Sequence, residues 1–159
     1  MQDTSMWINE QAKAGAAFQI ACADALERQG SALLTLLLAG GGGALAYAVN
    51  LSEKKAALWQ QVGMTGAALW LFALAAVLLI RGLWSRELYG PANDPANLMS
   101  AYDMALAEAV KYELENRQTC IERNRRRNDA VGFWLNICRC GAALTPLVFA
   151  LSAWVAAVY

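Results

Sequence analysis

Hydrophobic residues dominate three long stretches of the sequence, and segments rich in charged and polar residues separate them. The run from Val62 to Ile80 has 19 residues and no charged side chain. As a helix it would be about 28 Å long, close to the ~30 Å hydrocarbon core of a bilayer. The pattern therefore predicts a transmembrane helix over residues 62–84. Trp70 and Trp84 stand toward its ends, where interfacial anchors are common.

The apolar stretch at residues 31–50 predicts another spanning helix, joined to the first by a short polar turn, so that residues 31–84 form a hairpin. It contains four consecutive glycines. Glycine weakens a helix in water by about 1 kcal/mol per residue, but lipid offers the backbone no other hydrogen-bond partner. Small residues four apart let helices approach closely. We expect helix packing within or between subunits, or alternatively a kinked gate, at Gly40, Gly41, Gly42, Gly43, Gly63 and Gly66.

The last stretch, residues 131–159, predicts a third, C-terminal membrane helix, which Pro146 should kink. Arg139 interrupts its apolar start. If the span begins near Ala142, Arg139 lies at the headgroups and its side chain snorkels. If the span begins near Val131, Arg139 is an intramembrane charge and a functional candidate.

Two further segments predict helices outside the membrane. Residues 1–29 form an amphipathic pattern whose apolar stripe includes Trp7 and Phe18. The motif Asp94-Pro95 predicts the start of a long helix over residues 94–128. On that helix an acid precedes a base by four residues twice, at Glu113 with Arg117 and at Glu122 with Arg126, which is typical of ion pairs on a solvated face.

The long helix ends in a cluster of arginines, Arg123, Arg125, Arg126 and Arg127. Such a cluster beside an apolar segment is typical of anchoring against anionic headgroups on the cytosolic side. The alternative is a site for an anionic ligand such as a nucleotide or oligonucleotide. No aromatic residue interleaves the arginines and no glycine-rich loop precedes them, so stable binding of duplex nucleic acid is not expected.

The charge distribution sets the expected topology. The formal net charge is zero, yet eight of the thirteen basic residues lie between Arg81 and Arg127. The positive-inside tendency therefore places the N-terminus and residues 85–128 in the cytosol and Tyr159 outside, in an inner (cytoplasmic) membrane. The fold expected is an all-α integral membrane protein, with a two-helix membrane hairpin, a long cytosolic helix and a third membrane helix.

The composition argues against an enzyme. There is no histidine, which removes the usual general base and the common nucleophile pairs. The four cysteines, Cys22, Cys120, Cys138 and Cys140, contain no CxxC pair and are expected to be small buried or membrane-embedded thiols. We expect no catalytic site, cofactor or metal, and no cleaved signal peptide.

Two classes of function remain. One is a homo-oligomeric pore or channel that is gated through its cytosolic helices, with a narrow passage that gates by dewetting. The other is a non-conducting accessory or scaffold subunit beside a larger membrane protein. The residues that could line a pore are the polar ones within the spans, Thr35, Tyr47, Asn50, Thr65, Thr145 and Ser152.

The layout resembles that of the SLATT group of bacterial transmembrane effectors. The likeness rests on an N-terminal helix, two closely spaced spans at 31–50 and 62–83, the exit at Tyr89–Pro95 and an extended helical segment at 95–128. This resemblance implies a membrane pore that a nucleotide signal or sensor protein triggers during phage infection to arrest growth. The third span departs from the simplest two-span form, and a holin-like phage membrane protein is a neighbouring possibility.

Overall fold

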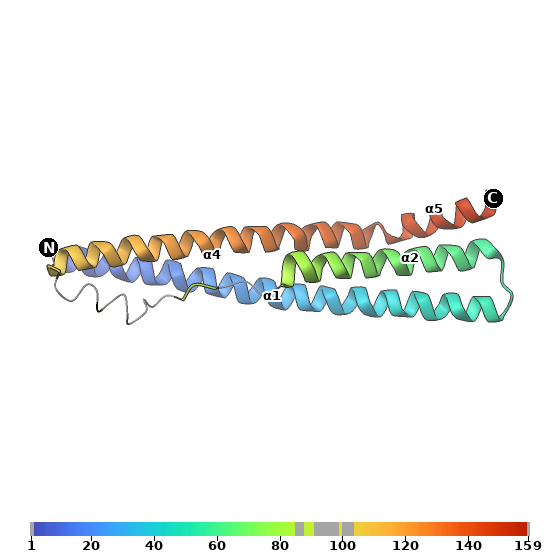
Figure 1. Cartoon of the computed structure of the whole chain (residues 1–159), viewed down its shortest axis with the longest axis horizontal. Coiled ribbons are helices and arrows are strands. Elements are labelled where there is room, and N and C mark those ends of the chain that lie inside the picture. The colour runs from blue at the N-terminus through green and yellow to red at the C-terminus, as the bar shows by residue number, and fades with distance from the viewer. Residues whose placement is uncertain (1, 85–87, 91–98, 100–103, 159) are drawn as a thin grey trace. The chain divides into compact units, whose positions relative to one another are not determined.

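The structure is a computed structural model that describes residues 2–84, 88–90, 99 and 104–158, with side chains from Met6 onward. The described residues are almost all helical and contain no strand, which confirms the all-α fold (Figure 1). The elements are helix α1 (Gln2–Glu53), helix α2 (Leu58–Val77), the π-helix η1 (Leu78–Leu83), helix α4 (Leu106–Ala143) and helix α5 (Thr145–Val158).

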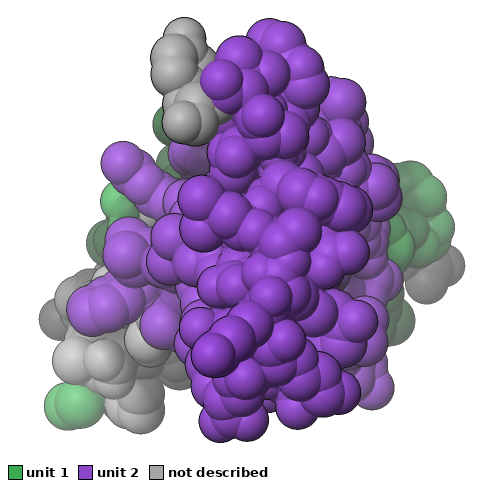
Figure 2. Space-filling view, turned by 90° about the vertical axis from the view of Figure 1, so that its right-hand side faces the viewer, with its two compact units in different colours: residues 1–26, 85–130 green, residues 27–84, 131–159 purple. Residues whose placement is uncertain are grey.

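The chain divides into two compact units (Figure 2). Unit 1 comprises residues 1–26 and 85–130, and unit 2 comprises residues 27–84 and 131–159. Two helical stretches, Met6–Glu53 and Leu58–Leu83, are long and apolar enough to cross a membrane. The chain is therefore described as a membrane protein with two candidate spans, to which α4 and α5 add a third if that bent pair counts as one span.

Helix α1 differs from expectation because one helix runs where the sequence predicted two, over residues 1–29 and 31–50. No proline interrupts it, so the backbone hydrogen bonds continue through Gly30. A Cβ at Gly30 would lie 2.6 Å from Leu83 Cδ2, so a larger residue here would require the Leu83 side chain to shift. The helix also continues through Gly40–Gly43, where a kink was the alternative prediction.

Helix α4 also crosses a boundary that the sequence suggested. It begins at Leu106, whereas Met104 and Ala105 are not helical, and it continues past residue 128 to Ala143. The predicted start at Asp94-Pro95 lies outside the described residues. No proline occurs between residues 106 and 143, so nothing in the backbone stops the helix before Thr145-Pro146. There α4 and α5 meet at a bend of 48°, as the proline predicts.

Unit 1 contains a parallel pair of helices, formed by the first half of α1 and the first part of α4. Contacts between them advance in the same direction along both chains, from Arg117 on Asn9 to Asn128 on Gln19. The face that α1 buries carries alanines seven residues apart, Ala16 and Ala23. This is the heptad spacing of helices that pack side by side, and the small side chains permit a close approach.

This packing corrects the apolar stripe that the sequence suggested for residues 1–29. Trp7 and Phe18 are each 63% exposed, because the face of α1 that meets α4 is the neighbouring one. A seam of alanines lets two helix backbones approach, whereas a bulky ring would hold them apart. The two aromatic side chains therefore form part of the exposed surface of unit 1.

Unit 2 is a bundle in which α2 lies antiparallel to its neighbours. Gly30 of α1 lies against Leu83, whereas Gly41, eleven residues later, lies against Phe72 earlier in α2. Helix α2 packs along α5 in the same antiparallel sense. The buried side chains at its centre are mostly Leu and Ala, namely Leu37, Ala48, Ala67, Ala68, Leu74, Ala75, Leu78, Val131, Leu135, Cys138 and Ala153.

A four-residue turn joins α1 to α2. Ala56 N–H bonds to Leu51 O at 2.9 Å and Lys55 N–H bonds to Ser52 O at 3.1 Å, which is the Schellman pattern of a helix C-terminus. Lys55 occupies the left-handed position with φ 52°, where glycine is usual. The tight turn fixes the antiparallel arrangement of α1 and α2.

Candidate functional site

The six glycines singled out by the sequence fall into two groups. Four of them face other helices of unit 2: a Cβ at Gly40 or Gly41 would meet Leu71 or Phe72 of α2. A Cβ at Gly63 would meet Phe149 and Ala153 of α5, and one at Gly66 would collide with Ser152. By contrast, nothing among the described residues lies within 4 Å of a Cβ built at Gly42 or Gly43. Packing within the chain therefore accounts for four of the glycines and leaves two unexplained.

Gly42 belongs to a row of small and polar residues that points away from the bundle. Steps of three and four along α1 place them on one face, and all are exposed: Thr35, Ala39, Gly42, Ala46 and Asn50. The opposite face carries the buried Leu37, Gly41 and Ala48. We call this row the outward face of α1. Thr35 Oγ1 donates a hydrogen bond to Ser31 O at 3.0 Å, so its donor is already used within the helix.

The other exposed surfaces of unit 2 carry large apolar side chains, including Leu36, Leu38, Leu45 and Val49 beside this row on α1. Helix α2 and η1 expose Leu69, Leu79 and Ile80, and α5 exposes Leu147, Leu151, Trp154, Val155 and Val158. Of the polar residues considered for a pore, Thr65, Thr145 and Ser152 are half-buried within the bundle, and Tyr47 is exposed beside the outward face of α1. The remaining two, Thr35 and Asn50, lie on that face.

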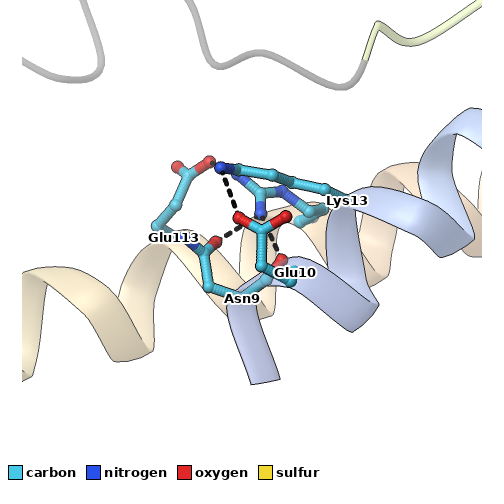
Figure 3. Close-up of polar contacts among 5 residues, drawn as sticks. Asn9, Glu10, Lys13 and Glu113 are labelled. Atoms are coloured by element: carbon cyan, nitrogen blue, oxygen red, sulfur yellow. Dashed lines mark hydrogen bonds and ion pairs between the residues drawn. The ribbon is translucent and has the colours of Figure 1, made fainter. Parts of the chain in front are cut away.

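Unit 1 has a polar helix seam at a position where apolar residues usually pack. Arg117 is only 8% exposed. Its Nη1 donates to Asn9 Oδ1 at 2.7 Å, and its Nη2 donates to Glu113 Oε1 at 2.9 Å. Figure 3 labels the two acceptor residues, Asn9 and Glu113. The sequence predicted the Glu113–Arg117 pair on a solvated face, and this was wrong in one respect: the pair exists but is buried between α4 and α1.

The second pair predicted on α4 does not form among the described residues. Glu122 accepts a hydrogen bond from Gln118 Nε2 at 2.8 Å, and no ion pair joins it to Arg126. Exposed ion pairs contribute little and are easily replaced by water. A spacing of four residues on the surface therefore permits such a pair without requiring it.

Asn124 attaches the segment after the second span to α4. This side chain is 1% exposed, and it exchanges two hydrogen bonds with the backbone of Tyr89. The Arg123 guanidinium lies over the Tyr89 ring, 5.1 Å from its centroid. Cation–π attraction of this kind is worth about 0.5–1 kcal/mol at exposed sites. Asn124 therefore holds the backbone of Tyr89, and Arg123 contacts its ring.

The four arginines of the cluster differ in exposure. Arg123, Arg125 and Arg126 are exposed, whereas Arg127 is half-buried and its Nη1 lies 3.4 Å from Asn128 Oδ1. Arg127 Nε is enclosed and has no hydrogen-bond acceptor among the described residues. Arg125 and Arg126 make no ion pair or hydrogen bond within the part of the chain that the structure describes.

Two arginines of unit 2 contact neighbouring helices. Arg139 is exposed, and its Nη2 donates to Gln29 Oε1 on α1 at 2.9 Å. Arg81, within η1, lies 5.7 Å from the centroid of the Trp134 ring on α4. The Gln29 amide oxygen satisfies part of the hydrogen-bonding capacity of Arg139.

Sequence reasoning missed the polar residues that hold unit 1 together, which are Arg117, Asn124 and Asn128, and it missed Tyr89 as the partner of Asn124. The sequence did contain a signal for this seam, which is a spacing that alternates between four and three residues. It runs through residues 117, 121, 124, 128, 131, 135 and 138. That register continues without interruption from polar residues into the buried Val131, Leu135 and Cys138. Reading the spacing without regard to polarity would have identified the seam.

The described residues offer few groups for covalent or metal chemistry. Among them no three cysteine or carboxylate side chains gather closely enough to hold a metal ion. The thiols are free: Cys138 is buried, Cys140 is exposed, and Cys22 and Cys120 are half-buried. The features left to explain are surfaces for association, namely the outward face of α1 and the exposed arginines.

Comparison with known protein families, with curated proteins and with solved structures gave no match to this chain. The functional argument therefore rests on the residues themselves.

Proposed function

We propose that the chain is one subunit of a homo-oligomeric pore in a cytoplasmic membrane. In this proposal the copies meet through the outward face of α1, and the helices of unit 1 lie in the cytosol and regulate opening. The trigger is a soluble signal or a partner protein that acts on unit 1. The resemblance in layout to SLATT effectors extends the proposal to growth arrest during phage infection.

The observation that carries the proposal is the contrast between exposed surfaces of unit 2. A helix surface that faces lipid gains nothing from small or polar residues, and helix contacts in membranes are enriched in them. The row Thr35, Ala39, Gly42, Ala46 and Asn50 holds no apolar side chain larger than alanine, although Leu38, Leu45 and Val49 are exposed beside it. The exposed residues of α5 are mainly large and apolar, as expected for a surface in contact with lipid.

We further propose that the end of α4 together with α5 forms a third span. The support is threefold: α5 packs along α2, its exposed residues are apolar, and the pair passes the length and composition criterion when taken as one bent span. Trp70 Nε1 donates to Gly141 O at 2.9 Å. Gly141 O also accepts from Leu144 N–H at 3.1 Å, and Ala142 O, which Pro146 has no N–H to bond, accepts from Thr145 Oγ1 at 2.7 Å.

The direct test is ion leak from vesicles that contain the purified full chain. We expect the wild-type chain, or a variant in which unit 1 no longer holds the pore closed, to release a trapped ion or small dye. We expect Gly42→Leu to abolish that release. A Cβ built at Gly42 has no atom of the described residues within 4 Å, so we expect the Gly42→Leu subunit to fold. Ala73→Leu places the same side chain at an exposed position of α2 and serves as the control.

Expression in cells with a dye that reports membrane potential extends this test to the trigger. Depolarisation that requires the product of a neighbouring gene would support a gated effector. If no permeability change occurs in vesicles or in cells under any condition, the non-conducting accessory subunit becomes the better account. A chain that alone opens large holes for soluble proteins would favour a holin-like role instead.

A further inference from the structure

The exposed arginines near the end of unit 1 present unused hydrogen-bond donors. Arg125 and Arg126 have no ion pair or hydrogen bond among the described residues, and each guanidinium carries five N–H donors in a rigid plane. Arginines that only solubilise a helix commonly alternate with acids, but here Glu122 and Asp129 flank the group and none lies within it. The segment therefore carries an excess of positive charge.

Arg123 adds a third guanidinium whose position is fixed. Its Cζ lies over the Tyr89 ring, 5.1 Å from the centroid, and a cation–π contact of this kind uses no N–H donor. The backbone of Tyr89 is in turn held by the two hydrogen bonds to Asn124. Arg127 is turned inward and is not part of this surface.

Guanidinium groups that are grouped and unpaired match phosphate oxygens, which accept several N–H donors at once. The position along α4 favours phosphate in a lipid. Phe133, which is 60% exposed, and Trp134 follow the arginines in the sequence, and aromatic residues of this kind are common at membrane interfaces.

We propose that Arg123, Arg125 and Arg126 form a binding surface for the phosphates of anionic lipids in the leaflet that faces unit 1. This inference rests on the membrane insertion proposed above but not on pore formation. If the inference holds, α4 binds the membrane surface more tightly as the content of anionic lipid rises.

The test measures lipid binding to the purified full chain by native mass spectrometry, with phosphatidylglycerol and phosphatidylcholine added separately. The wild-type chain should bind phosphatidylglycerol more tightly. The double variant Arg125→Gln/Arg126→Gln should lose about fivefold in that affinity per arginine, roughly 25-fold in all, with phosphatidylcholine binding unchanged. The matched control is Lys13→Gln/Lys111→Gln, which removes the same charge from exposed positions elsewhere in unit 1.

The outcomes separate the alternatives. Equal binding of both lipids by the wild-type chain, or an equal loss in the lysine control, would overturn the inference. Displacement of phosphatidylglycerol by excess inorganic phosphate would also overturn it, because the surface would then be a site for a soluble anion. Extraction of the membranes at alkaline pH reports insertion independently, so a chain that inserts without preferring anionic lipid refutes this inference alone.

Discussion

The amide of Asn124 pairs with the backbone of Tyr89 in both directions: Nδ2 donates to Tyr89 O at 2.8 Å, and Oδ1 accepts from Tyr89 N–H at 3.1 Å. One buried side chain thus satisfies the donor and the acceptor of a residue that lies outside any helix. The pairing attaches the segment that leaves the second span to α4. Its position next to Arg123 links the proposed lipid surface to this attachment.

Asn124→Ala should therefore destabilise unit 1. Both backbone groups of Tyr89 would lose their partner, at a cost of about 1–3 kcal/mol. Thermal unfolding in detergent measures the loss, and hydrogen exchange should show faster exchange at the Tyr89 amide. Asn116→Ala changes the same residue type on the same helix and should leave that amide unaffected. Unchanged exchange at Tyr89 in Asn124→Ala would contradict the pairing.

Arg117→Ala should also destabilise unit 1, because it removes the guanidinium that joins Asn9 and Glu113. Breaking a buried ion pair on one side leaves the other charge poorly solvated, and we expect a cost of about 2–4 kcal/mol, since Glu113 retains some exposure. Chemical unfolding in mild detergent is the measurement. Lys111→Ala disrupts an exposed pair with a 3.9 Å separation and should change stability by under about 0.5 kcal/mol. Equal effects of the two variants would show that burial of the Arg117 pair is unimportant.

Adjacent glycines of α1 should respond differently to the same substitution. Gly41→Leu places a side chain where a Cβ alone would lie 3.0 Å from Phe72 Cε1, so it should loosen the α1–α2 packing and lower the unfolding temperature. Gly42→Leu should leave the unfolding temperature of the detergent-solubilised monomer nearly unchanged and reduce cross-linked oligomers. Oligomer loss in Gly41→Leu but not in Gly42→Leu would argue against contact through the outward face of α1.

Lys55→Gly should stabilise the chain. Lys55 holds a left-handed conformation, which costs a residue with a Cβ roughly 1–2 kcal/mol and glycine much less. Part of the gain is offset by the greater freedom of glycine in the unfolded chain, so a net increase of about 0.5–1 kcal/mol is expected. The check is the midpoint of thermal unfolding beside Lys54→Gly, which changes the preceding residue of the turn. A decrease in Lys55→Gly would show that the turn does not need this conformation.

The sequence by itself determined the helical class, the two apolar stretches long enough to span and the bend before Pro146. These properties follow from local chemistry: apolar length, the absence of charge, and a residue that has no N–H group. The small-residue spacing singled out Gly40, Gly41, Gly63 and Gly66, which face other helices, but not Gly30 or Gly141, which also face them. The helices that they face were not predicted, because spacing along one helix does not specify which helix lies opposite.

Only the tertiary structure decided where helices continue, which side chains are buried and which small residues remain open. Helices α1 and α4 pass through segments where the charge pattern changes, because helix continuity depends on backbone hydrogen bonds and not on polarity. Arg117 and Asn124 are buried because partners distant in sequence satisfy them. Gly41 and Gly42 are identical in sequence terms, yet one faces Phe72 and the other faces outward, since one residue rotates a helix position by about 100°.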